Sequence, residues 1–263
     1  MLGTFGVWGP KHAWSERAGE VAELEALGYS TFWYAASPEA DLAVPEQMLA
    51  ATTTMTIATG VLNVWETDPE TVTASYRRIG SDRLVLGVGA GHKLYNAEYE
   101  RPLERVSAYL DGLDVPQDRL MLAALRPKML ELAARRTAGA HPYLNTPEHT
   151  AEARQALGDR LLAPAVCVVV EEDREAARRM AREFTLVHHT PLANYRNSWK
   201  RYGFTDDDFA GAGSDRLVDA VVPMGNPDQV AQRLRAHLEA GADHVAIQSL
   251  NGRYDELAAA LAP

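Results

Sequence analysis

The chain has 263 residues, 46% of them apolar, and a formal net charge of -10. This acidic balance disfavours nonspecific contact with nucleic acid or an anionic membrane surface, and no stretch approaches the roughly eighteen apolar residues of a membrane helix. We therefore expect a soluble protein with no nucleic-acid or membrane partner, which acts on a small-molecule substrate or contacts another protein.

The N-terminal residues and the single cysteine bear on the compartment. The opening MLGTFGVW has no basic region followed by an apolar run and a small-residue cleavage site, so no export signal is expected. Cys167 lies in the apolar run AVCVVV and has no second cysteine with which to form an internal disulfide. We expect a cytoplasmic protein in which this thiol is a small core residue.

Short β-type runs alternate with helical patterns along the whole chain. The eight strand candidates are 3–8, 30–34, 56–62, 84–88, 120–125, 140–144, 165–170 and 244–248. Between them, apolar residues recur at helical spacing, and a proline stands at several of the expected helix starts. Continuous apolar strands separated by helices predict a parallel sheet covered by helices. Eight such units predict a single (β/α)8 TIM-barrel domain over 1–263, with a doubly wound open sheet as the alternative.

One segment, 185–223, breaks this alternation. It is too long for a simple connection and is rich in aromatic and charged residues. We expect an inserted helical segment between the seventh and eighth strands. Such an insertion in a barrel would fold over the mouth as a lid or wall of the pocket, or serve a dimer contact.

The stretch DRLVLGVGAGHKLYN, residues 82–96, raises the question of a phosphate loop. Gly87, Gly89 and Gly91 do not have the G-x-G-x-x-G spacing, and no G-K-[ST] follows. Glycines at alternate positions of a strand instead leave one face bare for a flat ligand, and Gly60 stands at the corresponding end of the third strand. The alternative is that these glycines ease packing or turn the chain.

Four blocks of sequence resemble one family in their order and spacing. They are TIATGVLNVWETDPETV, DRLVLGVGAGH, RPKMLELAARRTAGAHPYLNTPEHT and GNPDQVAQRLRAHLEAGADHVAIQ. Together they are similar to the luciferase-like flavin and deazaflavin oxidoreductases, and specifically to the branch that uses coenzyme F420. The resemblance implies a TIM-type barrel with the deazaflavin at the carboxyl ends of the strands, and a homodimer.

The resemblance also implies cofactor-binding residues on the third and fourth strands. A non-proline cis peptide is expected at Gly60-Val61, where it would form a bulge behind the central ring. Asn63 matches a position that hydrogen-bonds the ring or its side chain. Ala90 and Gly91 match backbone positions near the cofactor.

A second set of matching positions follows the fifth strand. Arg126, Lys128 and Met129 match the loop and helix start that receive the cofactor phosphate. The free N–H groups of a helix N-terminus and two added cations suit an anion. The alternative is that these are simply exposed residues at a helix start.

His92 is the candidate catalytic residue, and the alternative is a loop histidine whose hydrogen bonds are made by the backbone. It matches a position that carries a proton-transferring carboxylate in the sugar-phosphate dehydrogenase branch, and an imidazole can exchange a proton near neutral pH. The same branch has an Asp-His pair after the second strand, where this chain has Ala36 and Ser37. Ser37, Trp8 and Trp65 are the expected substrate-pocket residues, with core packing as the other reading of the tryptophans.

Other chemistries find little support in the sequence. No H-E-x-x-H, CxxC or histidine-carboxylate cluster has metal-binding spacing, so no metal is expected. No G-x-S-x-G elbow is present, and no lysine lies within an apolar strand as an aldolase would need. The sequence therefore predicts an F420-dependent oxidoreductase that transfers a hydride between the deazaflavin and a small organic substrate. The alternatives are an FMN-dependent luciferase-like monooxygenase and a catalytically degenerate cofactor-binding protein.

Overall fold

Parallel strands form the centre of the computed structural model, which describes residues 2–262. The strands follow the order β10-β9-β11-β1-β2-β3-β5-β6-β7-β8, and β4 pairs with β5. A parallel bridge between Tyr143 and Ala165 brings the chain after β7 against β9. The bounds are β1 Phe5–Pro10, β2 Thr31–Ala35, β3 Thr56–Gly60, β4 Leu62–Asn63, β5 Leu84–Gly89, β6 Leu120–Leu122, β7 Gly139–Ala140, β8 Leu161–Leu162, β9 Ala165–Val170, β10 Met224–Gly225 and β11 Val245–Ser249.

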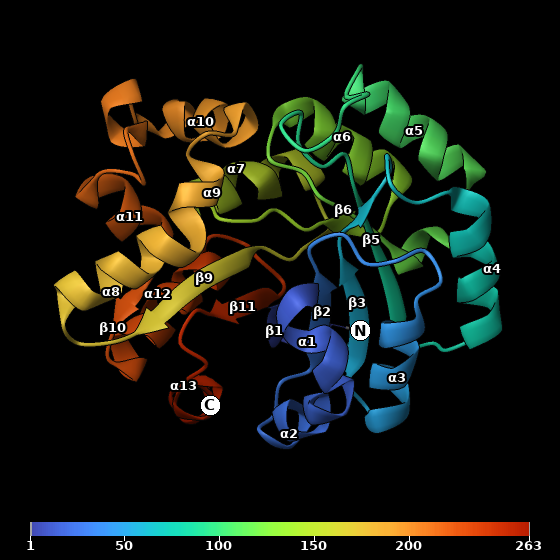
Figure 1. Cartoon of the computed structure of the whole chain (residues 1–263), viewed down its shortest axis with the longest axis horizontal. Helices are drawn as coiled ribbons and strands as arrows, with labels where there is room; N and C mark the ends of the chain where they lie inside the picture. Colours follow the sequence, from blue (N-terminus) through green and yellow to red (C-terminus); the bar gives the residue numbers. More distant parts are fainter. Residues whose placement is uncertain (1, 263) are drawn as a thin grey trace.

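Helices surround these strands (Figure 1), as expected for a (β/α)8 TIM barrel. Proline stands in the first turn of α4, α5, α6, α7 and α12, where its missing N–H group costs no hydrogen bond. The bounds are α1 Lys11–Trp14, α2 Val21–Ala26, α3 Ala43–Ala51, α4 Pro69–Ile79, α5 Pro102–Gly112, α6 Pro127–Arg136, α7 Pro147–Leu157, α8 Arg174–Ala181, α9 Val187–His189, α10 Ala193–Trp199, α11 Asp215–Val221, α12 Pro227–Glu239 and α13 Tyr254–Leu261.

The strands that were expected to be apolar on both faces are buried on both. Every residue of β2, β3, β5 and β9 is buried. Inside the barrel, the Trp33 indole stacks on the His141 imidazole at 3.7 Å between ring centroids, and its Nε1 donates to His244 Nε2 at 3.1 Å. This packed layer forms part of the core below the mouth of the barrel.

The predicted fold is confirmed, with changes in strand length. The expected strand 56–62 is divided into β3 and β4 by a cis peptide bond between Gly60 and Val61. The expected strands 120–125 and 140–144 shorten to three and two residues, because the chain leaves the sheet at each carboxyl end. The two-residue strands β8 and β10 had no counterpart among the predicted strands.

The helical insertion lies between β9 and β11, the seventh and eighth strands of the barrel. The segment 185–223 contains α9, α10 and α11. It has its own apolar cluster, which includes Leu192, Trp199, Phe209 and Val218, packed with residues of β9. This cluster anchors the insertion to the end of the barrel. Within residues 2–262, no helix is long and apolar enough to cross a membrane.

Candidate active site

A cavity of about 1110 Å³ opens at the carboxyl ends of the strands. The loops after β1, β2, β5 and β6 line one part of it, and α9 and α10 of the insertion line another. Eleven of the residues expected at the site contribute to its lining. They are Trp8, Ser37, Gly60, Val61, Asn63, Ala90, Gly91, His92, Arg126, Lys128 and Met129.

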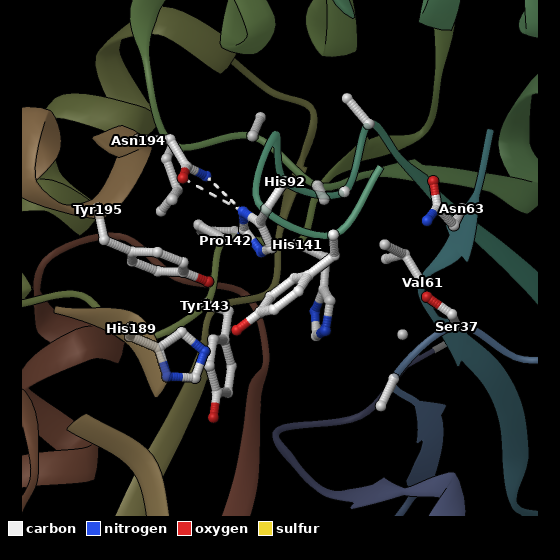
Figure 2. Close-up of a pocket in the computed structure, with 18 of the residues that line it drawn as sticks. Ser37, Val61, Asn63, His92, His141, Pro142, Tyr143, His189, Asn194 and Tyr195 are labelled. Carbon is white, nitrogen blue, oxygen red and sulfur yellow. Dashed lines mark hydrogen bonds between the residues drawn. The ribbon is translucent and has the colours of Figure 1, made fainter. Parts of the chain in front are cut away.

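Val61 contributes an apolar side chain to the cavity wall, and two glycines of β5 make room for it. A Cβ added to Gly89 would lie 2.6 Å from Val61 Cγ2, and one added to Gly87 would lie 3.0 Å from Val61 Cγ1. Figure 2 shows the Val61 side chain projecting toward the middle of the pocket. The expectation that the bare strand face itself receives a flat ligand is therefore wrong for these two glycines, because Val61 lies against both and the Thr59 carbonyl oxygen lies still closer to Gly87, 2.1 Å from an added Cβ.

Gly91 has a different reason to be glycine. Its φ of +57° favours glycine, and an added Cβ would lie 2.8 Å from Asn96 Nδ2. Asn63 Nδ2 donates to Asn96 Oδ1 at 2.9 Å and to Glu66 Oε1 at 2.8 Å. Both N–H donors of Asn63 are thus engaged by neighbouring side chains, and Gly91 leaves space for this amide network.

Trp65 is not among the residues that line the cavity, contrary to the expectation from sequence. Its indole Nε1 donates to the Ala90 carbonyl at 2.7 Å, and Arg105 lies over its ring at 5.3 Å. The ring is therefore turned toward the backbone after β5 and toward α5. Trp65 supports the position of Ala90, which does line the cavity.

His92 is half-buried at the cavity wall, and α10 holds its ring. Its Nδ1 lies 3.0 Å from Asn194 Nδ2 and 3.2 Å from Asn194 Oδ1 (Figure 2). Burial lowers the pKa of His92, and the hydrogen bond with Asn194 opposes that change in part. The imidazole is therefore held in the neutral form, which can accept a proton at one nitrogen.

Tyr143, in the chain that follows β7, is a pocket residue that the sequence reasoning missed. Its ring stacks on Trp8 at 4.9 Å, and its hydroxyl donates to Gln248 Oε1 at 2.8 Å. The hydroxyl also lies 3.0 Å from Cys167 Sγ, and burial raises the pKa of that thiol to about 11. Cys167 is thus a protonated core residue beneath the cavity, as expected.

The insertion contributes further pocket residues that were not singled out. His189, Asn194 and Tyr195 all line the cavity. Burial lowers the pKa of His189 to about 4. The hydrogen bond from its Nδ1 to the Thr185 carbonyl, at 2.7 Å, opposes this change in part. The aromatic content of 185–223 predicted a lid or wall of the pocket. Which of its side chains face the cavity depends on how α9 and α10 are rotated about their axes, and the sequence did not predict this.

Four cationic side chains lie around the cavity, and two of them have no partner within residues 2–262. Lys11 pairs with Glu39 at 3.0 Å, and Arg201 pairs with Glu152. Arg126 and Lys128 are exposed at the start of α6 and form no ion pair or side-chain hydrogen bond in the described chain. Free positive charge at a helix N-terminus fits an anionic group.

Ala36 and Ser37 follow β2 in a left-handed backbone conformation, with φ of 65° and 57°. Lys11 Nζ donates to the Ser37 carbonyl at 2.9 Å, which ties this turn to α1. Both residues line the cavity, but neither brings a titratable side chain.

Among residues 2–262, no group of three His, Cys, Asp or Glu side chains is arranged to hold a metal ion.

The fold and the cavity define a (β/α)8 barrel whose pocket lies at the carboxyl ends of its strands, the usual place of a barrel active site. A family model described as luciferase-like monooxygenase matches residues 95–244. This match spans more than half of the chain, and the protein belongs to this family. No curated protein sequence matches the chain significantly.

Solved structures share the fold across nearly the whole chain. An F420-dependent secondary alcohol dehydrogenase in complex with an F420-acetone adduct has a TM-score of 0.76 at 14% identity, with 100% of both chains covered. The coenzyme F420 dependent tetrahydromethanopterin reductase from Methanopyrus kandleri has a TM-score of 0.69 at 15% identity, covering 99% of this chain and 97% of that one. The oxygenating constituent of 3,6-diketocamphane monooxygenase from Pseudomonas putida, in complex with FMN, has a TM-score of 0.67 at 14% identity, covering 98% and 96%. These identities establish a common fold, and the neighbours include both F420-dependent and FMN-dependent enzymes.

Proposed function

We propose that this protein is an oxidoreductase that transfers a hydride between coenzyme F420 and a small organic substrate. The observation that carries the proposal is one cavity that combines an apolar buttress, Val61, with two unpaired cations, Arg126 and Lys128. A planar ring can rest on the first, and an anionic tail can bind the second. The most similar of the structures described above is an F420-dependent enzyme, which supports this choice of cofactor.

The residues present fit a deazaflavin in size and charge. A cavity of about 1110 Å³ exceeds the upper range of drug-sized pockets, so it has room for a large cofactor together with a small substrate. Val61 lies against Gly87 and Gly89, where an added Cβ would come within 3.0 Å and 2.6 Å of its methyl groups, so β5 backs this side chain. The start of α6 offers backbone N–H groups beside Arg126 and Lys128 to a phosphate.

The bound deazaflavin would supply a ring carbon that donates or accepts a hydride. The task left to this chain is to orient the two reactants, exclude water and manage one proton. His92 is our candidate for the proton. Asn194 holds its Nδ1, and its Nε2 forms no hydrogen bond with any residue of 2–262, so a proton can be exchanged at that atom.

Two other functions have an observation of their own. An FMN-dependent monooxygenase is favoured by the description of the family and by the FMN-bound neighbour. A cofactor-binding protein without turnover is favoured by Ala36 and Ser37, which bring no acid or base to the end of β2.

We also propose a homodimer, on the basis of the family resemblance. Sedimentation velocity would test this assembly.

Parallel titrations with coenzyme F420 and FMN test the proposal. We expect the protein to quench and retain the deazaflavin and to bind FMN much more weakly. Retention of FMN alone would replace the proposal with the monooxygenase function. The His92→Ala variant should bind the deazaflavin as the wild type does and lose turnover on a panel of alcohols, aldehydes and enones. Tight binding with no turnover by the wild type on that panel would favour the noncatalytic function.

A further inference from the structure

Tyr195 presents a buried hydroxyl to the cavity from the helical insertion. The residue is 4% exposed. Its ring packs against His189 at 4.9 Å, Trp199 at 5.5 Å and His92 at 5.6 Å between centroids. These contacts on several sides hold the ring in one orientation.

The Tyr195 hydroxyl has no hydrogen-bond partner among residues 2–262. A buried hydroxyl without a partner costs free energy, so such a group in a pocket points to a ligand or an ordered water. The unpartnered side-chain atoms that are fully sealed in the described chain are His141 Nε2, Asn145 Oδ1 and Thr146 Oγ1. Tyr195 Oη is not one of them, and Figure 2 shows it directed into the pocket. It is therefore a donor that a bound molecule can reach.

The surroundings of this hydroxyl are uncharged. Burial raises the pKa of Tyr195 and of Tyr143, and it lowers the pKa of His92 and of His189. All four side chains are thus neutral at pH 7. Among residues 2–262, the one carboxylate that lines the cavity is that of Glu66, which accepts a hydrogen bond from Asn63.

The uncharged residues around the Tyr195 hydroxyl lie across the pocket from Asn63. In Figure 2, Tyr195, His189 and Tyr143 lie on one side of the pocket, and Asn63 and Val61 lie on the other. The rings of Tyr143 and Trp8 lie on the same side of the pocket as Tyr195. The ring centroid of Tyr143 is 6.4 Å from that of Tyr195, and Tyr143 stacks on Trp8. Burial and the nearby Cys167 raise the pKa of Tyr195, and none of the four cationic side chains of the cavity acts on its hydroxyl. A charged group placed here would therefore lose its hydration without gaining a counter-charge.

We infer that Tyr195 Oη donates a hydrogen bond to the substrate, and that the substrate group bound there is an uncharged carbonyl oxygen of a ketone, aldehyde or enone. This inference rests on the proposed function for the identity of the second reactant, but the binding of the carbonyl can be measured without turnover. Tyr195 is then a specificity-determining residue supplied by α10, the same helix whose Asn194 holds His92.

Matched pairs of probes test this hydrogen bond. Cyclohexanone is compared with methylenecyclohexane, which has the same shape and no acceptor, and with cyclohexanecarboxylate, which is charged. Saturation-transfer NMR gives their affinities for the protein with and without oxidised coenzyme F420. We expect cyclohexanone to bind the wild type best, and Tyr195→Phe to weaken it about five- to tenfold, the typical effect of one net hydrogen bond. The affinity for methylenecyclohexane should not change.

Tyr76→Phe is the matched control, because it removes a phenol hydroxyl from α4, outside the cavity. It should leave all three affinities at wild-type values, and thermal melts should show that both variants fold. Equal cyclohexanone affinity in the wild type and Tyr195→Phe would overturn the inference. So would wild-type binding in which the hydrocarbon or the carboxylate equals or exceeds the ketone. Ketone discrimination that persists while coenzyme F420 fails to bind would reject the proposed cofactor and retain the role of Tyr195.

Discussion

Val61 occupies the space beside Gly89, since a Cβ on that glycine would lie 2.6 Å from Val61 Cγ2. It would also lie 3.0 Å from the Cβ of Ala123. The two neighbours enclose the position from both sides. A glycine at the end of β5 thus sets the position of a cavity-lining side chain that follows β3.

We therefore predict that Gly89→Ala destabilises the fold by about 1 to 3 kcal/mol, the usual cost of adding a methyl group to packed space. It should also weaken cofactor binding, because Val61 must move. Urea unfolding and the deazaflavin titration measure the two effects. Gly19→Ala is the control, because a Cβ there meets nothing within 4 Å. If Val61→Ala restores neither property in the Gly89→Ala background, the contact with Val61 is not the cause.

The Gly89 position illustrates how far sequence reasoning reaches. The spacing of Gly87, Gly89 and Gly91 was enough to exclude a Rossmann or phosphate loop. It could not show what fills the bare face, because that depends on the side-by-side placement of β4 and β5, in which Asn63 pairs with Gly89. The filling residue, Val61, lies at the junction between β3 and β4, so its identity follows only from the placement of that junction beside β5.

The fold itself was predictable, because a barrel strand is buried on both faces and its sequence is continuously apolar, as in AVCVVV of β9. The wall supplied by the insertion was predictable only in outline. Its aromatic residues indicated a lid or wall. Tyr195 and Trp199 of α10 both belong to the insertion's apolar cluster, but of these two Tyr195 lines the cavity and Trp199 does not. Helices this short have too few turns for a periodic pattern to distinguish the two.

The contact between Asn194 and His92 predicts a measurable change in titration. The hydrogen bond with Asn194 raises the pKa of His92 against the larger effect of burial. We expect Asn194→Ala to lower that pKa further, so that His92 takes up a proton only at more acidic pH. NMR of the imidazole ¹⁵N nuclei across pH 4 to 8 measures it directly.

Asn197→Ala, an exposed change on the same helix, should leave the titration of His92 unaltered. In steady-state assays with an identified substrate, the acidic limb of kcat/KM should move with the NMR titration in Asn194→Ala. An unchanged His92 titration in that variant would show that Asn194 does not set its protonation.

The two unpaired cations at the start of α6 predict a salt-sensitive step in cofactor binding. Replacing Arg126 and Lys128 together with alanine should weaken deazaflavin binding about tenfold or more, the typical loss for charge-assisted hydrogen bonds to an anion. The wild-type affinity should fall as salt rises, and the affinity of the double variant should fall less. Isothermal titration at low and high salt gives both numbers.

Arg135→Ala is the matched control, because this exposed cation lies near the far end of the same helix. It should bind the deazaflavin as the wild type does. If the double variant binds the deazaflavin with the same affinity and the same salt dependence as the wild type, the anionic tail of the cofactor binds elsewhere on the rim of the cavity.

His244 predicts a loss of stability in acid. Its Nδ1 donates to the Gly3 carbonyl at 2.9 Å, and its Nε2 accepts from Trp33 Nε1 at 3.1 Å. A second proton would have to occupy Nε2, which faces the indole N–H. Burial lowers the pKa of His244 to about 4, and hydrogen bonds to backbone carbonyls oppose this only in part.

Because the folded pKa lies below the ordinary value of about 6.5, the unfolded chain binds more protons between these two pH values. The contribution of His244 to stability is therefore complete above about pH 6.5 and is lost as the pH falls toward 4. For this one group, the free energy of unfolding should drop by about 1.3 kcal/mol between pH 7.5 and 5.5. Urea unfolding at the two pH values measures this. Between pH 7.5 and 5.5, the free energy of unfolding of His244→Gln should drop by about 1.3 kcal/mol less than that of the wild type. His12→Gln, which changes an exposed histidine, should keep the wild-type pH dependence, and equal pH dependence in His244→Gln and the wild type would contradict the assignment.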